Sequence, residues 1–157
     1  MMTAPGTRKR RSMIKTLPMK SDPLLHVRFD SSIKSSSIAR SRLKSFITEK
    51  CGIPLSDDVH ELLTAVGEAV SNAWRHGCGC GQGNIFIDAI YERELKLITV
   101  EISDPGSGFD ITMPFRPGPI EGVCACGRFL MQEFTDSVAY DRRGDHFVCI
   151  LTKTLAS

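Results

Sequence analysis

The stretch VGEAVSNAWRHG, residues 66–77, places a carboxylate, an amide and an imidazole at intervals of four residues. Glu68, Asn72 and His76 would share one face of an α-helix, because each step of four residues turns the helix by only about 40° beyond a full turn. The apolar residues of the same segment fall on another face. The stretch therefore predicts an amphipathic helix that presents a polar face to a site.

A carboxylate beside an amide oxygen suits a hard cation. Mg²⁺ prefers oxygen ligands and keeps several of its waters, while a carboxylate can orient or deprotonate a nucleophile. Glu68 and Asn72 therefore fit a magnesium site with a general base. A polar helix flank that ends in a capping histidine would give the same pattern.

A second motif, DPGSGFD at residues 104–110, follows a run with the character of a strand. Asp104 would lie at the end of that strand, where its carboxylate can accept a hydrogen bond from an exocyclic amine. Gly106 and Gly108 would let the backbone approach a ligand closely. Taken alone, the motif fits a bare turn equally well.

Hydrophobic periodicity predicts five strands and three helices around these motifs. The expected strands are 24–30, 84–92, 95–104, 137–141 and 146–155, and the expected helices are 36–52, 56–76 and 127–136. Arg93 and Glu94 would join the second and third strands as a tight hairpin, and Ile38 belongs to the apolar face of the first helix. Residues 105–122 are rich in Pro, Gly and Ser, which predicts a functional loop such as a lid.

Composition limits the class of protein. The chain has 157 residues, 41% of them apolar, which predicts one domain over residues 22–157. Residues 1–21 hold six of the 20 Lys and Arg and no acid, which predicts a disordered basic tail. The other 14 bases face 18 acids, so direct nucleic-acid binding is not expected. No membrane span or secretion signal is apparent. Six cysteines without such a signal favour a reducing, cytoplasmic location, in which thiols stay free or bind a metal.

The two motifs in this order, VGEAVSNAWRHG and then ISDPGSGFD, resemble the GHKL ATPase superfamily, and within it the small anti-sigma-factor serine kinases. The resemblance spans residues 24–155. It implies an α/β (α+β) two-layer sandwich of the Bergerat ATP-binding type. In that fold a mixed, mostly antiparallel sheet is covered on one face by helices, and ATP lies between the helices and a lid.

The resemblance also implies roles for individual residues. Glu68 would be the general base and Asn72 the Mg²⁺ ligand. Asp104 would recognise adenine, and Gly106 and Gly108 would form the floor of the nucleotide site. His76 matches a position at which the family often has His, and no catalytic role is expected for it.

The function implied is that of an ATP-dependent protein-serine kinase with ATP and Mg²⁺ as cofactors. Kinases of this branch bind a sigma factor and phosphorylate a serine on a STAS-type antagonist protein, and they often form homodimers. The sequence offers Arg40, Arg42 and Lys44 of the first helix as a surface for an acidic partner, although a solvated charged face would look the same.

The chain departs from the family at its third, glycine-rich motif. The equivalent stretch is GVCACG, residues 122–127, in which Gly122 and Gly127 remain. Ala125 in the middle would weaken the cradle for the phosphates, because a side chain hinders close backbone approach. Arg128 would either compensate by reaching a phosphate or be an ordinary solvent-facing arginine. The alternative function is a weakened or inactive regulatory module whose cysteine-modified lid responds to a metal or to oxidation.

Two Cys-X-Cys pairs flank the expected site. Their four thiolates would suffice for a tetrahedral Zn²⁺ site: Cys78, Cys80, Cys124 and Cys126. A reversible thiol switch and an incidental set of small residues remain open as alternatives. Cys51 and Cys149 are expected to be ordinary packing residues.

Overall fold

Five strands form one sheet in the computed structural model, which describes residues 22–79, 81–108 and 126–156. The strands are β1 (Leu24–Asp30), β2 (Asn84–Glu92), β3 (Leu97–Asp104), β4 (Ser137–Arg143) and β5 (His146–Thr154). Their order is β1-β2-β3-β5-β4, and each pair of neighbours is antiparallel. The sheet expected to be mostly antiparallel is therefore antiparallel at every described pairing.

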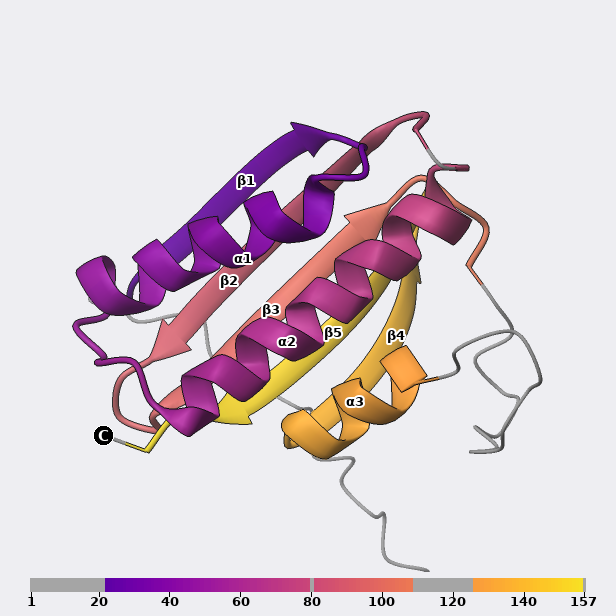
Figure 1. The fold of residues 1–157 in the computed structure, drawn as a ribbon. Coiled ribbons are helices and arrows are strands. Elements are labelled where there is room, and N and C mark those ends of the chain that lie inside the picture. The colour runs from indigo at the N-terminus through magenta and orange to yellow at the C-terminus, as the bar shows by residue number, and fades with distance from the viewer. Residues whose placement is uncertain (1–21, 80, 109–125, 157) are drawn as a thin grey trace, which may run out of the picture.

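Helices cover one face of this sheet (Figure 1). They are α1 (Ser35–Ser45), continued by the π-helical turn η1 (Phe46–Lys50); α2 (Asp57–Asn72), continued by the π-helical turn η2 (Ala73–Gly77); and α3 (Cys126–Phe134). Strands β2 and β3 bury every second side chain, and these side chains pack under the helices. The two-layer sandwich is thus confirmed. Within the described ranges, no helix has the length and apolar character of a membrane span.

The central helix, α2, begins where the sequence predicts. The side chain of Ser56 accepts a hydrogen bond from the backbone N–H of Val59, and two aspartates occupy the first turn near the positive end of the helix. Leu62, Val66 and Val70 are fully buried between α1, α3 and the sheet. This stripe holds the opposite, polar face of α2 in a fixed orientation.

Three local expectations are corrected by the structure. The hairpin turn between β2 and β3 spans residues 93–96 instead of two residues, because Lys96 adopts a positive φ of 52° and β3 starts only at Leu97. Ile38 of α1 is 37% exposed, since the helix turns this position away from the core. The last helix, α3, ends at Phe134, two residues before the expected end.

A buried lysine anchors the end of α3. Lys153 of β5 is 6% exposed, and its Nζ donates to the backbone oxygen of Phe134 at 2.8 Å and to Glu61 Oε2 of α2 at 2.7 Å. One ammonium group therefore joins α2, α3 and the sheet. Because α3 also borders the cavity described below, this anchor helps to place that helix.

Replacing Lys153 by methionine is expected to lower the free energy of unfolding by about 1–3 kcal/mol, because the partly buried carbonyl of Phe134 loses its charged donor. Glu61 remains partly in water and adds little to the loss. Urea denaturation followed by circular dichroism measures the change. Lys44→Met, at an exposed position of α1, is the matched control and should stay within about 0.5 kcal/mol of the wild type. Equal free energies of unfolding for Lys153→Met and Lys44→Met would contradict the anchoring role of Lys153.

Candidate functional site

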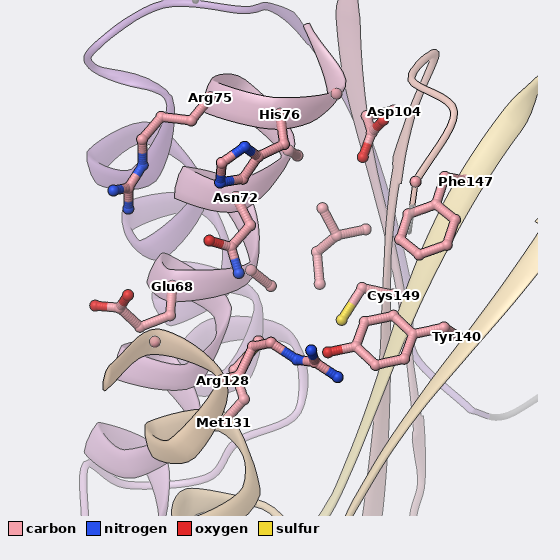
Figure 2. A pocket seen from close by; sticks show the side chains of 16 residues that line it. Glu68, Asn72, Arg75, His76, Asp104, Arg128, Met131, Tyr140, Phe147 and Cys149 are labelled. Atoms are coloured by element: carbon pink, nitrogen blue, oxygen red, sulfur yellow. The ribbon is translucent and has the colours of Figure 1, made fainter. Parts of the chain in front are cut away.

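A cavity of about 420 Å³ lies between the helical layer and the strands β3, β4 and β5 (Figure 2). Its lining brings together both sequence motifs and the start of α3. One wall comes from α2 and η2, the other from the sheet, and residues of α3 close it from below in the view of Figure 2.

The helical wall carries the polar face predicted from VGEAVSNAWRHG. Glu68 and Asn72 both line the cavity and are partly buried, and His76 lines it from an exposed position. The helix does not end at Gly77 in a simple cap. Instead the backbone N–H of Cys78 donates to the oxygen of Ala73 at 2.8 Å, five residues back, which widens the last turn.

The sheet wall carries Asp104, the last residue of β3. Its carboxylate is 5% exposed, and Oδ1 accepts a hydrogen bond from the backbone N–H of Gly106 at 2.8 Å. Burial raises the pKa of Asp104, while the bond from Gly106 and the charges of His146 and Arg142 act against this rise. Arg142 also donates to the oxygen of Gly106 at 3.1 Å and so holds the loop that follows β3.

The two motifs meet through glycines. A Cβ atom on Gly77 would overlap the carboxylate of Asp104, and one on Gly106 would lie 2.5 Å from the Cα of Gly77. Gly108 has a φ of +70°, and a side chain there would overlap the ring of Phe147. The end of η2 can therefore approach the end of β3 only because both segments lack side chains at these points.

The start of α3 closes the cavity near Glu68. A Cβ atom on Gly127 would lie 2.7 Å from Glu68 Oε2, so the backbone of α3 approaches this carboxylate closely. Arg128, the next residue, points across the cavity toward the sheet (Figure 2). Its guanidinium lies 5.8 Å from the ring centre of Tyr140, a cation–π distance, and Tyr140 stacks on Phe147 at 5.7 Å.

Comparison with known proteins identifies the family of this domain. The histidine kinase-like ATPase domain matches residues 31–153, which include the helical layer, the strands β2 to β4, nearly all of β5 and the residues that line the cavity. The chain belongs to this family. It is also similar to the anti-sigma F factor of Bacillus licheniformis, with 30% identity over 84% of this chain and 92% of the relative. The anti-sigma F factor of Clostridium kluyveri is 32% identical over 74% of this chain and 83% of its own length.

These relatives place the chain in the anti-sigma-factor branch of the ATPase family, as the sequence motifs predict. The fold agrees with a solved structure, that of the RsbU and RsbW domains of Rv1364c from Mycobacterium tuberculosis. The TM-score is 0.62 at 18% identity over 85% of this chain, which spans 32% of that larger chain. The likeness shows the fold of the ATPase domain.

Several predicted site residues are brought together on this ATPase domain. The cavity lining includes the predicted Glu68, Asn72, Asp104, Gly108, Gly127 and Arg128. Gly106 lies beside the cavity and contacts Gly77. Gly122 falls outside the described residues.

Sequence reasoning missed part of the lining. The structure adds Arg75, Met131, Tyr140, Phe147 and Cys149. Buried residues occur consecutively at the start of β5, from Phe147 to Cys149. The sequence carries a signal for this departure from alternation, because five apolar residues follow one another from Phe147 to Leu151. The position of Arg75 has no such signal in the sequence.

The cysteines of this ATPase domain differ in their positions and surroundings. Cys149 belongs to the cavity wall, and burial raises the pKa of its thiol to about 12, which makes it a poor nucleophile at neutral pH. Cys78 is buried between η2 and Ser31, and burial raises its pKa as well. Cys80 and Cys124 lie outside the described residues, and only the backbone of Cys126 is described. The zinc site therefore stays a hypothesis.

Proposed function

We propose that this chain binds Mg-ATP in the cavity and transfers the terminal phosphate to a serine of a partner protein. The proposal rests mainly on one observation, that residues of both sequence motifs line opposite walls of one cavity. Glu68 and Asn72 line the cavity on α2, Asp104 lines it on β3, and Gly77 packs closely against the carboxylate of Asp104. Membership in the ATPase family supports the nucleotide as ligand.

The cavity suits a nucleotide in its chemistry. Asp104 offers a buried carboxylate for an exocyclic amine, and Ile102, Met131 and Phe147 supply apolar walls for a base. Polar groups gather at the other end, where Asn72 of α2 and Gly127 of α3 lie near Glu68. Asn72 would hold the Mg²⁺ ion, which supplies charge neutralisation on the phosphates when it is bound.

Glu68 would act on the serine. Its carboxylate is partly exposed at the cavity wall, so a hydroxyl group of a partner could approach it. It would take the hydroxyl proton as the serine oxygen bonds to the γ-phosphorus. The bond from that phosphorus to the β–γ bridging oxygen breaks, and ADP leaves with the electron pair.

One partner would be a sigma factor, in line with the names of the anti-sigma relatives. The other would be a STAS-type antagonist, which the resemblance of the sequence motifs implies. Arg40, Arg42 and Lys44 are exposed on α1, which packs directly on α2. This helix would present positive charge to an acidic partner close to Glu68. Pairing of two chains as a homodimer belongs to the same proposal.

Calorimetry with ATP in the presence of Mg²⁺ and then of a chelator tests the proposal. The wild type is expected to bind ATP more tightly with Mg²⁺, and Asn72→Ala should remove most of this difference because the ion loses its protein ligand. Gln132→Ala, an exposed amide of α3 outside the cavity, is the matched control and should keep the difference.

Two outcomes would count against the kinase. No binding of ATP at millimolar concentration would exclude the nucleotide site. Binding without transfer of ³²P to a STAS-type antagonist would instead favour the alternative of a regulatory module that responds to nucleotide but performs no chemistry.

A further inference from the structure

Arg128 lies at the start of α3 and reaches across the cavity to the sheet (Figure 2). Its guanidinium carbon lies 5.8 Å from the ring centre of Tyr140 on β4, and Tyr140 in turn stacks on Phe147 of β5. Burial raises the pKa of Tyr140, while the charge of Arg128 and its hydrogen bond to the tyrosine act against this rise. A cation is therefore held against the sheet wall of the cavity.

This cation belongs to a different part of the cavity from the proposed phosphate site. Figure 2 shows the carboxylate of Glu68 turned away from the sheet, whereas the guanidinium of Arg128 is turned toward it. The phosphates would lie near Glu68 and Asn72 on the helical wall. The conformation of Arg128 therefore places its donors with the apolar walls proposed for the base.

The register of the sheet fixes how Arg128 lies relative to Asp104. Ile102 of β3 pairs with Cys149 of β5, and Cys149 pairs with Tyr140, so one row of the sheet leads from β3 to the ring beneath Arg128. Asp104 lies two residues further along β3 and lines the same cavity. The pocket therefore has an acceptor at one end and a cation at the other.

The distance between these two ends suits a purine base. Two strand spacings and one step of two residues separate the backbones of Asp104 and Tyr140 by about 12 Å, and side chains on the same face keep about this separation. An adenine with a hydrogen bond of about 2.9 Å at each end spans roughly 10 Å from its acceptor to its donor. The lining between the two ends is apolar and includes Ile102, Phe147 and Cys149.

We propose that Arg128 donates to the ring nitrogen of adenine that lies opposite the exocyclic amine, so that Asp104 and Arg128 select adenine together. This inference rests on the proposed nucleotide site. The amine of adenine is a donor and the opposite edge of the ring is an acceptor, which matches a carboxylate at one end and a guanidinium at the other. A guanidinium over a ring uses its face for that contact and keeps its N–H donors in its plane.

Guanine fits this pair of residues poorly. It carries a carbonyl oxygen in place of the amine of adenine, and this oxygen would face the carboxylate of Asp104. It also has an amine beside the ring nitrogen that Arg128 contacts, so a donor would face a donor. Arg128 is thus a specificity-determining residue for the base.

A contact of Arg128 with a phosphate would have different consequences. Its loss would weaken the binding of ATP and leave adenosine, which has no phosphate, unaffected. The loss of a contact with the base weakens ATP and adenosine alike.

Titration calorimetry with ATP, adenosine and 3-deaza-ATP, in which carbon replaces the ring nitrogen, tests the inference. The wild type is expected to bind 3-deaza-ATP about tenfold more weakly than ATP. Arg128→Leu should bind ATP and adenosine about tenfold more weakly than the wild type does, and it should no longer distinguish ATP from 3-deaza-ATP. Arg128→Lys should restore only part of the loss, because it keeps the charge without the planar fork.

Arg28→Leu is the matched control. Arg28 also lies over an aromatic ring, that of Phe86 at 5.8 Å, but it is exposed on β1 and outside the cavity lining. Its exchange should leave the affinities for ATP, adenosine and 3-deaza-ATP unchanged.

Equal affinities of the wild type for ATP and 3-deaza-ATP would overturn the inference, and this comparison does not depend on the folding of a variant. A loss in Arg128→Leu that is confined to ATP and spares adenosine would also overturn it, in favour of a phosphate contact. Both results leave the nucleotide site intact. A wild-type protein that binds neither ATP nor adenosine would instead overturn the proposed function itself.

Discussion

Replacing Glu68 by glutamine is expected to lower the rate of phosphate transfer by about 100-fold or more, while the affinity for ATP stays within about twofold of the wild type. The amide keeps the size and the hydrogen-bonding oxygen of the side chain but cannot accept the serine proton. Because Glu68 lies at the cavity wall beside Gly127 and is only partly buried, the exchange should not disturb the fold. Transfer of ³²P from ATP to the antagonist under single-turnover conditions measures the rate.

Glu133→Gln is the matched control for this experiment. Glu133 is an exposed glutamate of α3 outside the cavity lining, and its exchange should leave the rate unchanged. A Glu68→Gln variant that transfers phosphate at more than half the wild-type rate would show that another group, or water alone, receives the proton.

Replacing Asp104 by asparagine is expected to weaken ATP binding by about 30-fold or more without loss of stability. The amide offers the adenine amine a weaker, uncharged acceptor, and a charge-assisted bond contributes about 2 kcal/mol or more. Burial raises the pKa of Asp104, so the ionised carboxylate costs folding free energy at neutral pH. The melting temperature of Asp104→Asn should therefore equal or exceed that of the wild type, in contrast to its affinity.

The raised pKa of Asp104 also leads to a prediction for the pH dependence of ATP binding. Its folded-state pKa lies above the usual value for an aspartate, so the ionised form that accepts the amine is lost as the pH falls through that raised pKa. As the pH is lowered, the affinity of the wild type for ATP should therefore begin to fall at a higher pH than it would with an exposed aspartate at this position. The affinity of Asp104→Asn should show no such fall. Asp145→Asn, in the exposed turn between β4 and β5, should behave as the wild type. A parallel decline in wild type and Asp104→Asn would assign the titration to another group.

The local sequence pattern was sufficient to predict most of the helices and strands. β1 and β2 begin and end at the predicted residues because their side chains alternate over their whole length. α2 starts after Ser56 because a capping hydroxyl and two aspartates precede a long apolar stripe. Each of these signals lies within one segment of chain, so no distant contact was needed to recognise it.

Boundaries were less predictable where the backbone leaves its usual conformations. The turn before β3 depends on the positive φ of Lys96, and such a conformation in a lysine has little signature in sequence. The helix expected to end at residue 76 ends instead in the widened turn η2, because the packing of this turn against the end of β3 decides its shape. Both features lie next to contacts with distant segments.

The sequence by itself determined the elements, the two motifs and the kind of ligand that the motifs imply. Only the tertiary structure decided that Gly77 meets Asp104, that Arg128 lies over Tyr140, and that Arg75 shares a wall with Glu68. The physical reason is that periodicity and capping are set by neighbours within a few residues. The composition of a cavity wall depends instead on which distant backbones pack together and on the direction in which that packing turns each side chain.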